Sequence, residues 1–166
     1  TRPWFIVIAA ALCVAGALAA WRMLSAREAA PAVSYTLLDG SQNSIAAQRG
    51  KVLLVNFWAT SCVACVAEMP QIASTHQKFK SRGYETVAVA MDYDQPAAVA
   101  RFAQSRALPF GVALDKGGEV ARAFGDVKLT PTTFLIDKQG RIVKRYLGAP
   151  DFGALDRLIG ELLSER

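Results

Sequence analysis

Two cysteines separated by two residues, Cys62 and Cys65, are the side chains of this sequence with the clearest chemical potential. They stand in the stretch FWATSCVACVAEMP, where an apolar run ends and a helical pattern begins. Such a pair can exchange a disulfide with another thiol, bind a soft metal ion, or fill a core. A structural zinc site needs four ligands, and the sequence offers neither a second C-x-x-C motif nor a pair of histidines. Disulfide exchange is therefore favoured, and Cu(I) binding by the two thiolates is the alternative.

The location of Cys62 suits it to the role of attacking nucleophile. We expect it in the first turn of a helix capped by Thr60 or Ser61, where unpaired amides and the helix dipole stabilise an anion. That environment lowers the pKa of a thiol from about 8.5 to the range of about 3.5–7.5. Cys65 follows one turn later, more buried and close enough to form a disulfide. Cys62 would then attack a substrate disulfide, and Cys65 would resolve the mixed disulfide.

Two buried strands and a helix are predicted around this motif. Residues 51–58 and 84–92 are nearly continuous β-branched, aromatic and apolar runs, as expected for strands buried on both faces. Residues 62–82 form the helix between them, in which Pro70 predicts a kink. Its apolar stripe advances by four and three residues, the spacing of one helical face, through Cys65, Met69, Ile72, His76 and Phe79.

The second half of the chain adds a helix, a hairpin and a last helix. Asp94 is the expected N-cap of a helix that has Pro96 in its first turn. Residues 132–136 and 141–147 are the expected strands of the hairpin, and Asp151 caps the last helix. Strands that alternate with helices, followed by a hairpin and a helix, predict a mixed sheet covered by helices, an α/β sandwich.

The N-terminal segment predicts attachment to a membrane. Residues 4–21 carry no charge, and as a helix they would span about 27 Å, close to the hydrocarbon core of about 30 Å. Tryptophans end this run and arginines lie outside it, which is typical of interfacial anchoring. We expect a transmembrane anchor in residues 1–24, with a signal peptide as the alternative. A linker in residues 25–32 and one domain in residues 33–166 would follow.

Composition excludes several classes of function. The chain is 52% apolar, enough for a substantial core, and its net charge is +5. The basic residues form no cluster interleaved with aromatic residues, so we expect no nucleic-acid partner. No glycine-rich loop that could cradle a phosphate is visible, so no nicotinamide or flavin cofactor is expected, and no resident metal either.

Two motifs in combination resemble those of a known family. VNFWATSCVACVAEMP, followed further along the chain by TPTTFLIDKQGRIV, resembles the TlpA/ResA-like membrane-anchored thiol–disulfide oxidoreductases of the thioredoxin superfamily, relatives of the cytochrome c maturation reductases. The resemblance implies a thioredoxin-like three-layer α/β/α sandwich with an N-terminal extension and a helix–strand insertion near residues 94–114. It also implies a cis peptide bond between Thr130 and Pro131 that faces the cysteines, where the adjoining backbone can pair with an extended substrate.

The resemblance also indicates supporting residues. Glu68 stands three residues after Cys65, where the family often carries an acid that could accept the proton of that cysteine or raise its pKa. The alternative for Glu68 is a solvated helix residue. Trp58 is expected either beside the active site, as in thioredoxins, or simply in the core. The sequence departs from the thioredoxin pattern at Ala64, where proline is usual, and at Asn56, where a buried acid is usual.

These features together predict a membrane-tethered reductant on the periplasmic, extracytoplasmic side of the cytoplasmic membrane. By resemblance, its clients would be proteins with disulfides or C-x-x-C motifs, such as apocytochrome c or copper-site proteins awaiting metal. Without a cofactor, the domain would receive electrons from a thiol protein of the membrane. A Cu(I) metallochaperone is the alternative function. A thiol peroxidase ranks last, because Ala59 takes the place of the threonine or serine usual three residues before the attacking cysteine.

Overall fold

Seven strands of this chain form a single mixed sheet. The computed structural model describes residues 4, 8, 12–14, 16 and 27–165. The strands are β1 (Ser34–Leu37), β2 (Gln42–Ser44), β3 (Val52–Trp58), β4 (Tyr84–Ala90), β5 (Gly111–Leu114), β6 (Thr132–Ile136) and β7 (Ile142–Leu147). Their order across the sheet is β2-β1-β5-β4-β3-β6-β7. The pairs β3–β4 and β4–β5 are parallel, and the remaining pairs are antiparallel.

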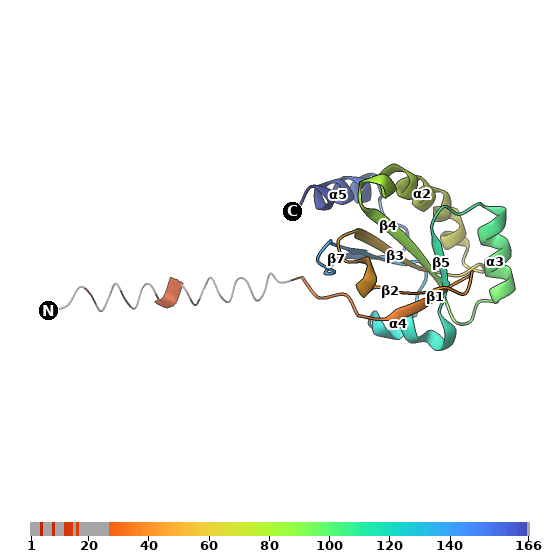
Figure 1. Ribbon diagram of the computed structural model, residues 1–166, viewed down its shortest axis with the longest axis horizontal. Helices are drawn as coiled ribbons and strands as arrows, with labels where there is room; N and C mark the ends of the chain where they lie inside the picture. The colour runs from red at the N-terminus through yellow and green to blue at the C-terminus, as the bar shows by residue number, and fades with distance from the viewer. Residues whose placement is uncertain (1–3, 5–7, 9–11, 15, 17–26, 166) are drawn as a thin grey trace.

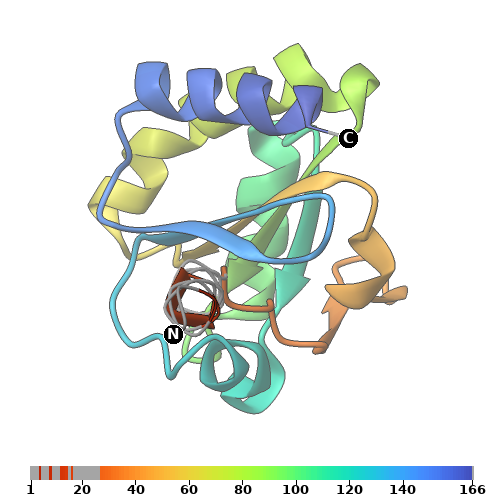
Figure 2. The ribbon, with the colours of Figure 1, turned by 90° about the vertical axis from the view of Figure 1, so that its left-hand side faces the viewer.

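Helices cover both faces of this sheet. They are α2 (Val63–Phe79), α3 (Pro96–Ser105), α4 (Glu119–Ala123) and α5 (Phe152–Ser164). Helices α2 and α5 lie side by side over one face, and α4 lies against the other (Figures 1 and 2). The predicted α/β sandwich is confirmed, including the hairpin of β6 and β7 and the insertion made of α3 and β5.

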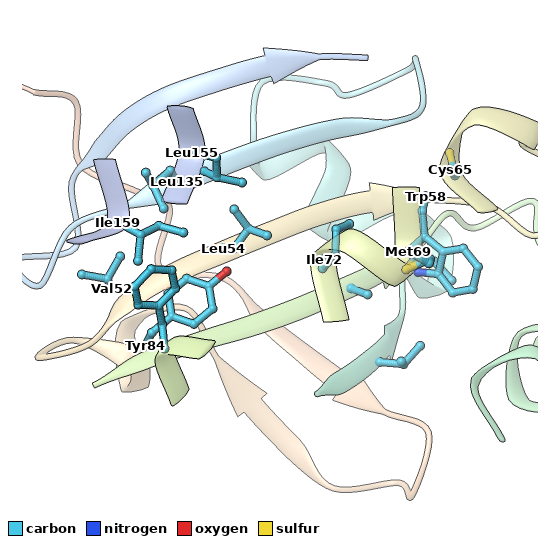
Figure 3. Packing of buried hydrophobic residues seen from close by; sticks show 14 of the residues in the cluster. Val52, Leu54, Trp58, Cys65, Met69, Ile72, Tyr84, Leu135, Leu155 and Ile159 are labelled. Atoms are coloured by element: carbon cyan, nitrogen blue, oxygen red, sulfur yellow. The ribbon is translucent and has the colours of Figure 1, made fainter. Parts of the chain in front are cut away.

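The central strand β3 divides the core into two halves because successive side chains point to opposite faces. Leu54 and Trp58 pack under α2 and α5, whereas Leu53 and Phe57 pack toward α4. All seven residues of β3 are buried, as the continuous apolar run predicts for a strand covered on both faces. Figure 3 shows the first half, and at one end of it Trp58 and Met69 lie beside Cys65.

Helix α2 buries the stripe that its sequence predicts. All five residues of that stripe are buried, and Pro70 lies inside the helix. The helix is shorter at both ends than residues 62–82. It begins at Val63, and after Phe79 the chain continues as a short 3₁₀ turn, Lys80–Arg82, which ends at Gly83 in a left-handed conformation. Glycine adopts a positive φ without steric cost, so this turn stops the helix and leads into β4.

Residues 27–30 form hydrogen bonds and an ion pair with the turn between β6 and β7, at the end of the sheet opposite Trp58. The Ala30 amide donates to the Gly140 carbonyl oxygen at 2.8 Å, and Arg27 forms an ion pair of 3.1 Å with Asp137. These residues belong to the stretch for which the sequence predicts a linker. Among the residues that the structure describes, no helix is both long and apolar enough to cross a bilayer. The predicted anchor at residues 4–21 lies largely outside them.

Candidate functional site

The redox pair lies at the junction between β3 and α2. Cys62 and Cys65 form a disulfide, with their Cα atoms 5.2 Å apart. Cys62 is half-buried, and Cys65 is fully buried. The expected cap at Thr60 or Ser61 is wrong, because Cys62 is itself the N-cap and its sulfur accepts the Cys65 amide at 3.2 Å. A sulfur atom in this position receives an amide that the first turn of the helix leaves unpaired.

Thr60 binds the loop after β4 instead of the helix. Its amide and hydroxyl donate to the two carboxylate oxygens of Asp94 at 2.5 and 2.6 Å. Asp94 is therefore not the N-cap of α3 that the sequence predicts, since that position is taken by Gln95. Pro96 does occupy the first turn, as expected. The carboxylate of Asp94 thus joins the inserted α3 unit to the loop that carries the disulfide.

The predicted cis peptide bond between Thr130 and Pro131 is present. It lies at the same end of the sheet as the disulfide, because the next residue, Thr132, is paired with Phe57 of β3. The Pro131 carbonyl oxygen accepts the Gly148 amide at 2.8 Å, which fixes the loop. The backbone groups of Thr130 make no hydrogen bond with the described part of the chain. They are free to pair with an incoming extended segment.

Glu68 is buried beneath the redox pair rather than solvated. It is 3% exposed, and as the third residue after Cys65 it lies on the same side of α2. Its Oε1 atom accepts a hydrogen bond of 2.9 Å from the Asn56 amide. Burial raises the pKa of Glu68 to about 7, although the bond from Asn56 opposes that rise. This carboxyl group therefore exchanges its proton near neutral pH.

Asn56 and Thr133 complete this buried cluster. The Asn56 Nδ2 atom donates to Glu68 and also to the Thr133 hydroxyl at 2.9 Å. Thioredoxins carry an acidic residue at the position of Asn56. Here Asn56 instead binds the carboxyl group of Glu68, which belongs to helix α2. The sequence analysis named Asn56 only as a departure from the thioredoxin pattern and did not name Thr133. For Asn56 a signal was available, because it is a polar residue inside the otherwise apolar strand β3.

Trp58 and His76 both belong to the core, at different distances from the disulfide. Trp58 is fully buried and packs on the Phe102 ring of α3, with centroids 5.1 Å apart. His76 lies on the inner stripe of α2, about four turns from Cys62, and contacts the rings of Tyr84 and Phe110. Burial lowers the pKa of His76. The candidate site therefore comprises the disulfide, Trp58 beside Cys65, the Glu68 cluster, and the cis-proline loop at the same end of the sheet.

A mixed sheet covered by helices, with a C-x-x-C disulfide at a helix start and a cis-proline loop beside it, defines the class of thioredoxin-like thiol–disulfide oxidoreductases. Comparisons with known proteins agree with this assignment. The family model for redoxins matches residues 25–159, so the chain belongs to the redoxin family. Within that family it is a ResA-like thiol–disulfide oxidoreductase with the redox pair Cys62 and Cys65.

Individual relatives support the same grouping. The thiol–disulfide oxidoreductase ResA of Bacillus thuringiensis subsp. konkukian is 38% identical over 119 residues, which are 72% of this chain and 68% of the relative. ResA of Bacillus subtilis is 37% identical over 126 residues, or 75% and 69% of the two chains. A crystal structure of a thiol:disulfide interchange protein from Chlorobium tepidum has a TM-score of 0.76 and 28% identity. That alignment covers 84% of this chain and 99% of the other.

Proposed function

We propose that this protein is a membrane-tethered, extracytoplasmic reductant of disulfides in client proteins. The observation that carries the proposal is the asymmetry of the redox pair. Cys62 is half-exposed at the helix start, whereas Cys65 is buried on the same side of α2 as a carboxyl group with a pKa of about 7. One sulfur can therefore reach a client, and the other can lose its proton inside the protein.

The reaction begins at the exposed sulfur of the reduced protein. The Cys62 thiolate attacks one sulfur of the client disulfide, the client S–S bond breaks, and the second client sulfur leaves as a thiolate that takes up a proton. Amides at the start of α2 stabilise the attacking thiolate, since the Cys62 sulfur occupies the N-cap position. The extended client segment pairs with the free backbone of Thr130, beside Pro131.

The second step releases the client and uses Glu68. The ionised Glu68 carboxylate accepts the Cys65 proton, and the resulting Cys65 thiolate attacks the Cys62 sulfur. The mixed disulfide breaks, the displaced client sulfur takes up a proton from solvent or from Glu68, and the client leaves as a dithiol with two electrons gained. The protein is left with the Cys62–Cys65 disulfide, which a membrane thiol protein must reduce before the next turnover. Trp58 shields this step from water through its packing on Phe102.

The proposed location of the protein and the class of its clients are inferred from the sequence. The uncharged run at residues 4–21, with tryptophans at its ends and arginines beyond them, supports a tether in the cytoplasmic membrane with the domain outside the cytoplasm. The resemblance to ResA-like proteins supports clients such as apocytochrome c, whose C-x-x-C cysteines must be reduced before haem is attached, or copper-site proteins. Fractionation followed by carbonate extraction tests the tether, because a peripheral protein is released by that treatment.

Two cysteine variants test the mechanism. Cys62→Ser should abolish the reduction of insulin or of a client peptide, whereas Cys65→Ser should accumulate covalent mixed disulfides with the client. Full activity in both variants would reject the proposal. The direction of electron flow is tested by the reduction potential of the pair in redox buffers. A value near that of thioredoxin, about −270 mV, supports a reductant, and a value near about −120 mV would show an oxidant.

A further inference from the structure

A groove runs between α2 and α3 beside the redox pair. It has a volume of about 230 Å³ and is lined mainly by apolar side chains, among them Val66, Met69, Pro70, Phe102 and Leu108. Its lining begins one helical turn after Cys62, because Val66 lines it and the Val66 amide donates to the Cys62 carbonyl oxygen at 3.0 Å. It also adjoins the buried core of the site, since Phe102 packs on Trp58. Any protein whose disulfide reaches Cys62 therefore approaches this α2–α3 groove.

One backbone carbonyl of α2 beside the α2–α3 groove lacks its usual donor. Proline has no N–H group, so Pro70 cannot donate to the Val66 carbonyl as the fourth residue of a helix normally does. Both residues line the groove. The Val66 carbonyl therefore lacks the donor that a helix normally supplies. A polypeptide segment, unlike a purely apolar molecule, can offer an N–H group to such a carbonyl as well as an apolar side chain to the groove.

The charged side chain in the lining of the α2–α3 groove is positive. Arg106 lines it, is exposed, and lies over the Phe102 ring with the guanidinium carbon 5.7 Å from the ring centroid. Arg106 forms no ion pair with any residue that the structure describes. No acidic side chain is among the groove-lining residues. The groove is thus complementary to a segment that carries both an apolar side chain and a carboxylate.

We propose that the α2–α3 groove binds the part of a client protein next to the cysteine that Cys62 attacks. An apolar client side chain enters between the helices, and an aspartate or glutamate of the client pairs with Arg106. The groove extends along α2 from Val66 to Ala73, about 10 Å, which corresponds to about three residues of extended peptide. This inference rests on the proposed function and adds to it the recognition of acidic–apolar sequence beside the client cysteine.

The test compares peptide disulfides that differ in one charge. Two peptides carry a cysteine in a mixed disulfide with glutathione, followed within three residues by leucine and by either aspartate or lysine. Hydroxyethyl disulfide, which is small and neutral, reports the chemistry of Cys62 alone. Rate constants are measured with the reduced full chain. The aspartate peptide should react about threefold to tenfold faster than the lysine peptide at low salt, and the difference should shrink in high salt.

Matched variants assign that preference to the groove. Arg106→Glu should reverse the charge preference, whereas Arg101→Glu, an exposed arginine of α3 outside the groove lining, should leave it in place. Ala73→Phe fills the groove and should slow both peptides about tenfold without changing the rate with hydroxyethyl disulfide. Ser74→Phe, at the exposed neighbouring position, should slow neither.

The outcomes separate the groove from the redox function. Equal rates for the two peptides overturn the inference, as does an equal effect of the two arginine variants, because long-range charge would then explain the preference. Unchanged peptide rates in Ala73→Phe overturn it as well. In these cases the reduction of hydroxyethyl disulfide still supports the proposed function. A protein that reduces neither the peptides nor hydroxyethyl disulfide refutes both proposals.

Discussion

Replacement of Glu68 by glutamine should change how the stability of the protein depends on pH. Glu68 is buried, and its pKa in the folded protein is raised from 4.5 to about 7 by burial, against the opposing hydrogen bond from Asn56. Between these two pH values the folded protein keeps the proton, whereas the unfolded chain releases it. The unfolded state is therefore favoured progressively as pH rises through this window.

The magnitude follows from the difference between the two pKa values. A rise of about 2.5 units, at 1.36 kcal/mol per unit, removes about 3 kcal/mol from the free energy of unfolding between pH 4 and pH 8. The glutamine side chain in Glu68→Gln does not titrate, so the unfolding free energy of this variant does not fall in this way. Relative to the wild type, the glutamine variant should gain about 3 kcal/mol of stability over that pH range. At 2–4 °C per kcal/mol, this is a relative rise in Tm of about 10 °C.

The assay is urea unfolding of the oxidised protein at pH 4, 6 and 8, with wild type and variant measured side by side. In the oxidised form Cys62 and Cys65 are joined and do not titrate, so they do not contribute. The lowered pKa of His76 contributes equally to both proteins and cancels in the difference. A difference in unfolding free energy between the two proteins that stays constant from pH 4 to pH 8 would refute the reasoning about Glu68.

Three other substitutions have defined outcomes. Asp137→Ala should cost about 3 kcal/mol at pH 7 in urea unfolding, since its buried carboxylate accepts bonds from Arg27 and Arg141. Although burial raises the pKa of Asp137, those bonds lower it on balance, so this contribution should persist above pH 4 and disappear in stronger acid. Asp94→Ala should speed hydrogen exchange of the Thr60 amide at least about tenfold, because that amide loses its acceptor. Gly160→Ala should raise stability by about 0.5–1 kcal/mol, since nothing lies within 4 Å of the added methyl group in α5.

Nearby residues provide controls for these substitutions. Lys128→Ala removes an exposed ion pair with Asp126 and should cost far less stability than Asp137→Ala. Asp92→Ala, two residues before Asp94, should leave exchange of the Thr60 amide unchanged. Gly83→Ala should be destabilising, because its φ of +89° strains a residue with a side chain. Equal effects of a substitution and its control would contradict the contact assigned to it.

Regular elements of this fold were predictable because their signals are local. The hairpin strands differ from the prediction by one residue, and Asp151 caps α5 as expected, with its carboxylate accepting the Ala154 amide. Strand β2 was not predicted, since Gln42–Ser44 is short and polar and shows no alternation. The cap of α2 was assigned wrongly because threonine and serine are the usual cap residues, whereas here a cysteine sulfur accepts the amide.

The site was predictable in part for the same reason. The spacing of Cys62 and Cys65 is a local signal, and so is the proline that follows Thr130. The cluster around Glu68 is not local, since Asn56 is 12 residues away and Thr133 is 77 residues from Asn56. Only the pairing of β3 with β6 brings these polar groups together. The burial of Glu68 depends on how the strands are ordered in the sheet, so its position in the helix alone could not predict it.

The hydrogen-bond directions in this cluster determine which oxygen of Glu68 carries the proton. The Asn56 Nδ2 atom has two N–H groups, and both are used, one toward Glu68 Oε1 and one toward Thr133. Oε1 is therefore an acceptor in both protonation states, and the proton resides on Oε2, which has no partner among the described residues. Glu68 can then take and release a proton without breaking its bond to Asn56. In the proposed reaction, the carboxyl group can thus serve Cys65 in every turnover while its position in the core stays fixed.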